Sequence, residues 1–364
     1  MNRVVVTGVG VICPAGLGVE AFQSALSAGR PLGEVMERPG RHGRARSLRV
    51  AKLPTFDRTR YLPARSLRRM GELSQIWTLA CLLARTDAGF DEGGEMSPPE
   101  KRGTFLGTGL GCTDTTWEYL EGMFRDGMAA ASPYLFAESV ANAAAGHSAI
   151  EVDARGTCVT LTCGDASAAA ALGTAARALR DGRLDLAYCG GVELMTEPLL
   201  RVLAPLGGPS HLGEGAVCLL LETFQRARSR SARVLAEVCG VGLASDPSAP
   251  ATSWSSDPEV FALAMRRALA APGSESGKAT TPPVGSLLLH ACGWSGSDEA
   301  ERRAGEAACP RVPQWAITPI FGTHAAAGGM ALAAAVLETG RYGSILLNAH
   351  AWGGGAYSLL FRAN

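Results

Sequence analysis

The chain has 364 residues, with 34 basic against 34 acidic side chains and 47% hydrophobic residues. This length and apolar content exclude a disordered or fibrous protein and suffice for a large core in one or two domains. A formal net charge of +0 offers no basic face to nucleic acid or to an anionic membrane surface, so we expect neither as a partner.

The ten cysteines are spread along the chain without a C-x-x-C pair, and no secretory leader precedes the apolar run at residues 4–6. This pattern predicts reduced thiols and a cytoplasmic protein. The most apolar stretches are residues 168–180, which Arg177 interrupts, and residues 325–337, which are short and lead into Glu338. Neither qualifies as a membrane span.

In chain order, β-branched residues at 4–12 predict a strand buried on both faces, and the stripe of apolar residues in 18–28 predicts a helix after it. Residues 31–61 are rich in Arg, Pro and Gly without a clear period, so we expect a surface excursion whose role the sequence leaves open. Residues 66–86 predict a helix, and 103–109 predict a short strand that ends in glycines.

Residues 161–196 are the most informative region. They predict an extended run, a tight turn at Gly164 and Asp165, an Ala-rich helix over about 166–180 and a strand over 184–191. Side chains this small let neighbouring backbones approach closely, as is typical of a helix threaded through the middle of a layered α/β fold.

The same alternation continues to the C-terminus. Further strands are predicted at 217–221, 234–242, 284–290, 314–320 and 344–348, with a helix at 325–338. We place the boundary between two halves near residue 230, which gives an N-terminal half of residues 1–230 and a C-terminal half of residues 231–364 in one compact unit. The pattern predicts an α/β fold with two sheets, although no repeat in the sequence demonstrates a duplication.

The turn before the Ala-rich helix is the first candidate site. Backbone N–H groups and the helix dipole favour a negative charge there, and Asp165 could supply it. Asp165 could instead serve only as a cap of the helix, and the spacing alone favours that interpretation.

Two histidines follow predicted strands in the C-terminal half. His290 ends an apolar strand and runs into a Gly/Ser loop, and His324 precedes the Ala/Gly-rich helix. Ligands bind at strand ends in α/β sheets, and two such histidines together favour a site over two core residues. His42, His147 and His211 lack a comparable context, so we expect them to be structural or exposed. No Cys and His spacing predicts a metal site.

Several motifs point to one family. They are VVVTGVGV at 4–11, LDLAYCGG at 184–191, GEGA at 213–216, and His290 with Gly293, Asp298 and Glu301 at the spacing H-G-T-G-T-x-x-N-D-x-x-E. In these residues the chain resembles the β-ketoacyl-acyl-carrier-protein synthases, condensing enzymes of the thiolase fold, over essentially its full length. The resemblance implies a layered α-β-α-β-α fold with two pseudo-repeated halves.

The chain departs from this family at several motif positions. His324 matches the family's second histidine, but Pro319 occupies the position of the motif lysine. In the terminal loop, which resembles N-S-F-G-F-G-G, His350 replaces the gating phenylalanine and Trp352 the second aromatic residue. The resemblance implies a pocket for the acyl chain and its pantetheine arm, formed by Cys163, His350, Trp352, Gly353 and Gly354.

The main departure concerns the nucleophile. In the family, the catalytic cysteine lies ten positions after an arginine and eight before a glycine, which match Arg155 and Gly173 here. The residue at that position in this chain is Asp165. Cys163 lies two residues earlier and becomes the nucleophile only with compensating insertions on both sides of the turn. A carboxylate cannot hold the acyl chain as a thioester. Its charge should also raise the proton affinity of His290 and His324 if they are close.

The resemblance therefore implies a chain-length factor that forms a heterodimer with an active ketosynthase, although a homodimer stays open. The contact would involve residues 157–162 and helices within 136–150. Alternatives are a malonyl-carrier decarboxylase that uses His290 and His324, an active synthase with Cys163, and a scaffold that docks acyl carrier protein. No cofactor is expected in the chain, because 4'-phosphopantetheine arrives on the carrier protein.

Overall fold

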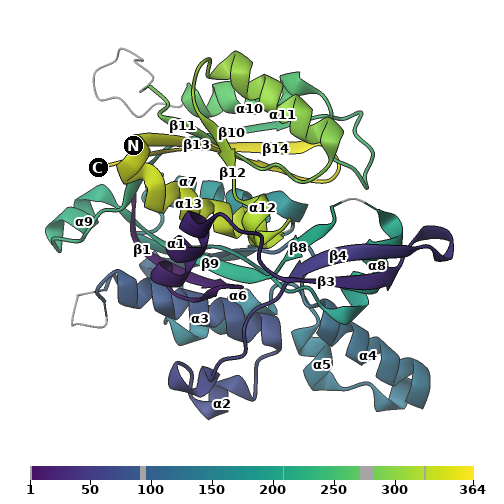
Figure 1. Cartoon of the computed structure of the whole chain (residues 1–364). Helices are drawn as coiled ribbons and strands as arrows, with labels where there is room; N and C mark the ends of the chain where they lie inside the picture. Colours follow the sequence, from purple (N-terminus) through teal and green to yellow (C-terminus); the bar gives the residue numbers. More distant parts are fainter. Residues whose placement is uncertain (1, 91–95, 208, 271–282, 324) are drawn as a thin grey trace.

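The computed structural model describes residues 2–90, 96–207, 209–270, 283–323 and 325–364 in five alternating layers (Figure 1). Two sets of strands enclose a central helix pair, α7 (Ser167–Arg180) and α13 (Ala325–Tyr342), which contact each other. Helices α3 (Glu72–Asp87) and α6 (Ala143–Glu151) cover one outer face, and α10 (Pro258–Leu269) and α11 (Ser295–Ala308) cover the other. This is the layered α/β fold expected from the sequence.

The strands form two sets with the same topology. The first set is β1 (Val4–Cys13), β5 (Arg102–Gly107), β6 (Cys158–Leu161), β7 (Leu186–Glu193) and β9 (Gly215–Thr223). The second set is β10 (Ala236–Ser245), β11 (Ser286–Leu289), β12 (Gln314–Ala316), β13 (Ser344–His350) and β14 (Gly355–Arg362). Their spatial orders, β6-β5-β7-β9-β1 and β12-β11-β13-β14-β10, place equivalent strands in equivalent positions.

The directions of the strands repeat as well. In the first set, β6, β5 and β7 run parallel, and the pairs β7–β9 and β9–β1 are antiparallel. In the second set, β12, β11 and β13 run parallel, and the pairs β13–β14 and β14–β10 are antiparallel. A short antiparallel contact of Val5 and Val6 with Glu237 and Ala236 joins the two sets into one continuous sheet. The duplication that no sequence repeat demonstrates is therefore present in the topology, and the expected boundary near residue 230 lies just before β10.

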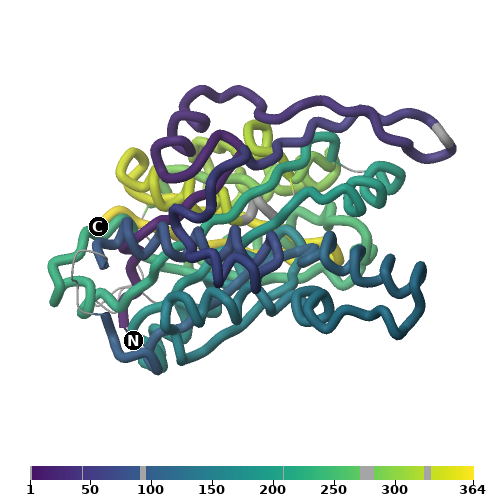
Figure 2. The backbone as a smooth tube through the Cα atoms, turned by 90° about the horizontal axis from the view of Figure 1, so that it is seen from below, coloured from purple at the N-terminus to yellow at the C-terminus, as the bar shows by residue number. Residues whose placement is uncertain are grey.

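The segment 31–61 was expected to be a surface excursion, and it contains regular structure that the sequence did not predict. It contains an antiparallel hairpin, β3 (Glu34–Pro39) and β4 (Ala45–Ala51), to which β8 (His211–Gly213) adds a parallel strand. In Figures 1 and 2 the hairpin extends away from the body of the molecule. Leu48 and Val50 are buried against α8 (Glu197–Leu206). Two buried apolar side chains can anchor β4, but they are too few to produce a recognisable alternation of apolar residues in the sequence.

A second difference concerns residues 314–320, which were expected to form one strand. β12 ends at Ala316, and a short helix, α12 (Thr318–Phe321), follows with Pro319 in its first turn. Proline fits the first turn of a helix because its missing N–H has no partner there.

The remaining helices and strands lie around these layers. They are β2 (Gly16–Leu17), α1 (Val19–Ala28), α2 (Ala64–Leu67), α4 (Thr113–Asp126), α5 (Pro133–Glu138) and α9 (Phe224–Ser229). Among the described residues, no helix combines the length and apolarity needed to cross a membrane. All ten cysteines are free thiols, as predicted.

The start of α7 touches the strands beside it through backbone. A side-chain Cβ built on Gly107 in β5 would lie 2.3 Å from the carbonyl carbon of Ser167 and 2.4 Å from the amide nitrogen of Ala168. A Cβ on Gly191 in β7 would lie 2.8 Å from the Ala168 Cβ. Small residues at these places let the central helix enter between the two sets of strands.

We predict that Gly107→Ala lowers the free energy of unfolding by about 2 kcal/mol, because the added methyl group meets rigid backbone. The control is Gly122→Ala in α4, where nothing lies within 4 Å of the new Cβ. This control should be neutral or stabilising by up to about 1 kcal/mol, as expected for alanine in a helix. Urea unfolding measures both, and equal stability of the two variants would contradict the packing argument.

Candidate active site

Four buried side chains from different elements meet at one place. Asp165 lies in the 3-10 turn Gly164–Ala166 that leads into α7, His290 directly follows β11, His350 is the last residue of β13, and Glu301 belongs to α11. Their exposed fractions are 4%, 3%, 2% and 0%. The carboxyl ends of the parallel strands β11 and β13 bring the two histidines together, and strand ends of this kind hold ligands in α/β folds.

The turn before α7 is fixed by its own polar groups. The Ser167 hydroxyl accepts a hydrogen bond from the backbone N–H of Cys163 (2.8 Å) and donates one to the carbonyl of Gly164 (2.6 Å). Gly164 has a positive φ of 55°, and a Cβ on it would lie 3.6 Å from the amide nitrogen of Trp352. The turn therefore packs directly on the loop after β13, which carries several of the predicted pocket residues.

Asp165 and Cys163 lie in different surroundings within this turn. The Cys163 sulfur is half-buried, and the Tyr357 hydroxyl of β14 donates to it at 3.8 Å. Burial and the neighbouring Cys163 raise the pKa of Tyr357 to about 12. Asp165, by contrast, is close enough to His290 and His350 that its charge raises the pKa of both. The group that faces the imidazoles from the start of α7 is thus a carboxylate.

The hydrogen bond between the two histidines determines the tautomer of His290. Its Nδ1 atom accepts the backbone N–H of His350 at 3.1 Å, so a neutral His290 ring carries its proton on Nε2. The two rings lie edge to face, with centroids 5.2 Å apart. The His350 ring in turn stacks on Phe261 of α10 at 4.0 Å.

Burial keeps both imidazoles neutral. It is the largest cause of the lowered pKa of His290, with a further contribution from His350, and it lowers the pKa of His350 to about 3. Asp165 acts in the expected direction by raising both pKa values, but the desolvation of the rings outweighs it. The expected effect of Asp165 on His290 is therefore present, but burial is the larger effect and leaves the pKa of His290 below its usual value. A neutral ring with Nε2–H is a hydrogen-bond donor suited to a carbonyl oxygen.

Glu301 and Asp298 hold the loop that carries His290. The Glu301 carboxylate accepts the backbone N–H groups of His290 (2.8 Å) and Ala291 (3.0 Å), and Ala291 has a positive φ of 48°. Asp298 accepts the N–H of Gly293 (3.1 Å) and contacts the Cys292 thiol at 3.3 Å. Burial raises the pKa of both carboxyl groups. Asp298 and Glu301 lie one turn apart in α11, and both bind backbone N–H groups of the loop after β11. This explains their spacing from His290 in the sequence.

The terminal loop is also held by its backbone. The N–H of Gly353 donates to the Ser253 carbonyl at 3.0 Å, and the Gly354 carbonyl accepts the N–H of Asp246 at 2.9 Å. Both glycines have positive φ, 76° and 83°. The Trp352 ring packs edge to face on Trp254 at 5.5 Å, and Trp254 lies 6.2 Å from Trp294.

Not every expected site residue can be followed in the structure. His324 lies outside the described residues, so its role stays a prediction, as does the role of the predicted pocket residues. Phe261, Tyr357 and Trp254 contact site residues but were missed from the sequence, because nothing in their local pattern distinguishes them from core positions. Among the described residues, no group of three His, Cys, Asp or Glu side chains could hold a metal ion.

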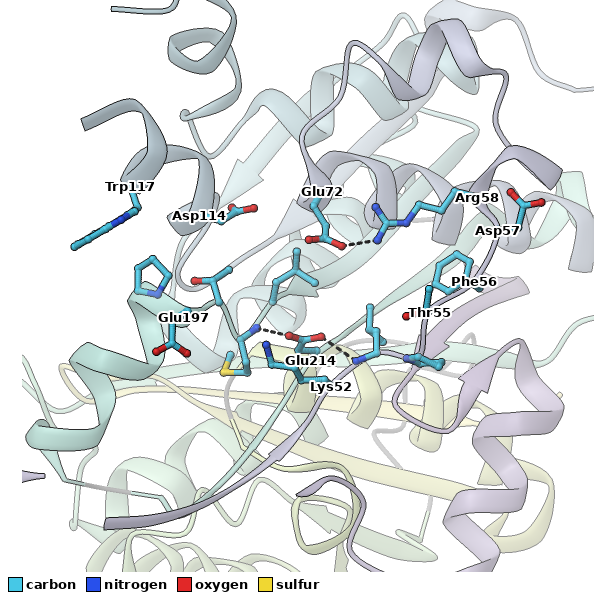
Figure 3. A pocket seen from close by; sticks show the side chains of 16 residues that line it. Lys52, Thr55, Phe56, Asp57, Arg58, Glu72, Asp114, Trp117, Glu197 and Glu214 are labelled. Atoms are coloured by element: carbon cyan, nitrogen blue, oxygen red, sulfur yellow. Dashed lines mark hydrogen bonds and ion pairs between the residues drawn. The ribbon is translucent and has the colours of Figure 1, made fainter. Parts of the chain in front are cut away.

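A separate cavity of about 810 Å³ lies beside the loop between β4 and α2 (Figure 3). None of the predicted catalytic or pocket residues lines it. Glu214, from the GEGA turn, accepts the backbone N–H groups of Leu53 (2.9 Å) and Met195 (3.1 Å), and Arg58 pairs with Glu72. Glu214 therefore fastens the end of β4 to the segment after β7.

Comparison with known proteins gives a consistent result. The family model described as "Beta-ketoacyl synthase, N-terminal domain" matches residues 1–204. Nodulation protein E of Rhizobium leguminosarum bv. trifolii is 29% identical over 351 residues, which cover 89% of this chain and 79% of the relative. The 3-oxoacyl-[acyl-carrier-protein] synthase 2 of Vibrio cholerae is 27% identical over 338 residues, which cover 85% of this chain and 79% of the relative.

Solved structures share the fold over the full chain. A β-ketoacyl synthase from Burkholderia phymatum superimposes with a TM-score of 0.84 at 24% identity, covering 100% of both chains. The ishigamide ketosynthase/chain length factor has a TM-score of 0.81 at 24% identity, covering 100% of this chain and 99% of the other. The ketosynthase ApeO in complex with its chain length factor ApeC from Xenorhabdus doucetiae also gives 0.81, at 16% identity, covering 100% and 98%.

The low pKa of His350 makes stability depend on pH. In the unfolded chain an imidazole titrates near 6.5, whereas the folded chain holds the pKa of His350 at about 3. Below about pH 6.5 the unfolded state therefore binds a proton that the folded state excludes, and stability falls as the pH falls toward 3. We predict that a change from about pH 7.5 to about pH 5 lowers the free energy of unfolding of both chains. The loss should be about 2 kcal/mol larger for the wild-type chain than for the His350→Phe variant.

The phenyl ring in His350→Phe keeps the stack on Phe261 and removes the titrating group. Unfolding by urea at the two pH values measures the difference for each chain. Equal losses in the wild type and the variant would contradict the burial of a neutral imidazole at this position.

Proposed function

The chain belongs to the β-ketoacyl synthase family, and we propose that within it this chain is a chain-length-factor-like subunit that pairs with an active, cysteine-bearing ketosynthase. The observation that supports this proposal most is the carboxylate of Asp165 beside two neutral imidazoles, with the Cys163 thiol directed to Tyr357 instead. The proposed role is to shape the site in which the partner extends an acyl chain on acyl carrier protein.

Condensation requires a nucleophile that holds the growing chain. A thiolate at a helix N-terminus does this as a thioester. A carboxylate in the same position is a weak nucleophile, and the mixed anhydride that it would form is too reactive to wait for a second substrate. With Asp165 at the start of α7, this chain is therefore suited to support condensation by a partner and not to condense by itself.

The surface also favours a partner. Strand β6 lies at the edge of the large sheet, and Cys158 on it is exposed. Edge strands that present unpaired backbone groups are sites for pairing with another chain. Large apolar side chains are exposed along the chain from α4 to α6, which we call the α4–α6 surface: Trp117, Leu120, Phe124, Met128, Tyr134, Phe136, Val140 and Ile150. So much exposed apolar surface marks a protein interaction site.

Other proteins of similar structure are compatible with this role. The structural neighbours include a ketosynthase in complex with its chain length factor, and a ketosynthase with an acyl-carrier protein. Their likeness supports the fold, and the assignment of a partner and of a carrier protein to this chain is part of our proposal. The 4'-phosphopantetheine arm would come with the carrier as part of the substrate.

A second candidate function is decarboxylation of malonyl carrier protein. The Nε2–H of His290 could hold the thioester oxygen as the enolate forms, which would not need a cysteine. The negative charge of Asp165 opposes this function, because it repels both the malonyl carboxylate and the enolate. We therefore place it second.

The decisive experiment mixes the purified chain with a cysteine-bearing ketosynthase encoded beside it and with malonyl- and acyl-loaded carrier protein. We expect extended product only from the mixture. Extended product from this chain alone would contradict the proposal. Acetyl carrier from this chain alone, lost in His290→Gln, would support the decarboxylase instead.

A second prediction concerns the interface. The double variant Phe136→Glu with Ile150→Glu places charges on side chains that are 58% and 76% exposed, so folding should be unaffected. We expect association with the ketosynthase to weaken at least about tenfold, because the charges would be desolvated in the complex.

The matched control is Val35→Glu on β3, which is 58% exposed and lies outside the α4–α6 surface. It should leave association unchanged. Sedimentation of co-purified chains measures the dissociation constants. If the double variant binds as tightly as the control, the α4–α6 surface does not form the interface.

A further inference from the structure

The buried site contains polar atoms that need a partner. His290 Nε2 and His350 Nδ1 have no hydrogen-bond partner among the described residues, although both rings are at least 97% buried. Buried polar atoms in proteins are almost always satisfied by protein, water or ligand. Two of them within one site, next to the carboxylate of Asp165, indicate a small oxygen-containing group between the rings and the start of α7.

The proton positions define which group fits. Because Nδ1 of His290 accepts the N–H of His350, Nε2 is a donor and is suited to a carbonyl oxygen. Asp165 is an acceptor when ionised and is suited to the hydrogen of a water molecule. A donor for the carbonyl oxygen and an acceptor for a proton of water are the two parts that hydrolysis of an acyl group requires.

We propose that this site hydrolyses acyl thioesters, with Asp165 as the general base for a water molecule and His290 as the donor to the carbonyl oxygen. The water oxygen attacks the thioester carbon while Asp165 takes one of its protons. Nε2–H of His290 stabilises the oxyanion of the tetrahedral intermediate. The C–S bond then breaks, the thiolate leaves, and the proton held by Asp165 returns to the sulfur, which yields a free acid and a thiol.

The surroundings support this assignment over a covalent route. Burial keeps both imidazoles neutral, so His290 can donate without transferring a full charge. Glu301 holds the backbone of His290 and Ala291 at 2.8 and 3.0 Å, which fixes the donor before substrate arrives. Preorganised donors of this kind account for a large part of catalysis in acyl transfer.

This activity goes beyond the proposed function. In a complex with a ketosynthase it would release acyl chains from the carrier, so the chain would edit or terminate products as well as shape the site in which the partner extends them. The substrate class rests on the proposed function, because the carrier presents thioesters, but the hydrolysis needs no partner. It can therefore be tested on this chain alone.

The test incubates the purified chain with acetyl, hexanoyl and decanoyl thioesters of N-acetylcysteamine and follows release of the thiol. We expect turnover of at least one thioester, reduced about 100-fold in Asp165→Asn and in His290→Gln. The control is Asp181→Asn at the other end of α7, an exposed residue that pairs with Arg183 and lies outside the site. Two independent site variants keep the test valid if one of them fails to fold.

Labelled water separates general-base catalysis from covalent catalysis. In a single turnover in ¹⁸O-water, our mechanism places the label in the released acid and none in the peptide that contains Asp165. Label in Asp165 would overturn the role of general base. If the wild-type chain releases no more thiol than the Asp165→Asn variant from any of the three thioesters, the proposed activity is wrong. The reconstitution with a ketosynthase tests the proposed function separately.

Discussion

The site depends on the close packing of backbone around the start of α7. Gly107 and Gly191 leave no space for a side chain against Ser167 and Ala168, so the helix enters the centre of the molecule in a single position. The preceding turn, held by the Ser167 hydroxyl, is fixed by the same contact. Residue 165 consequently faces His290 and His350, whatever its chemical identity, and its side chain decides what the site can do.

In this chain that side chain is a carboxylate in a largely dehydrated place. Burial lowers the pKa of both histidines, and this effect is larger than the opposite effect of the Asp165 charge. The result is a pair of neutral rings next to a negative charge, with the Nε2–H of His290 available as a hydrogen-bond donor. This combination suits binding and polarisation of a carbonyl group better than formation of a stable acyl intermediate.

Much of this arrangement could be predicted from the sequence. The β-branched run at 4–12, the Ala-rich helix at 166–180 and the spacing of His290, Asp298 and Glu301 are local patterns, and the structure contains the corresponding elements. The β3–β4 hairpin was missed because its larger buried side chains, Leu48 and Val50 with Met36 packed beside them, are too few to form a recognisable hydrophobic period. Phe261 and Tyr357 reach the site through α10 and β14, which are remote in sequence from α7, so no local pattern could reveal them. The burial that lowers the pKa of His290 could not be predicted, because it is visible only in the folded chain.

The most direct test of this account is to acylate the chain and its Asp165→Cys variant with an acyl thioester and to map the modified peptide by mass spectrometry. The account predicts no acyl adduct on the wild-type chain and an adduct on the new cysteine in the variant, because residue 165 faces the two imidazoles from the start of α7. An adduct on Cys163 of the wild-type chain would contradict it, since the chain would then carry its own nucleophile and would act as a synthase.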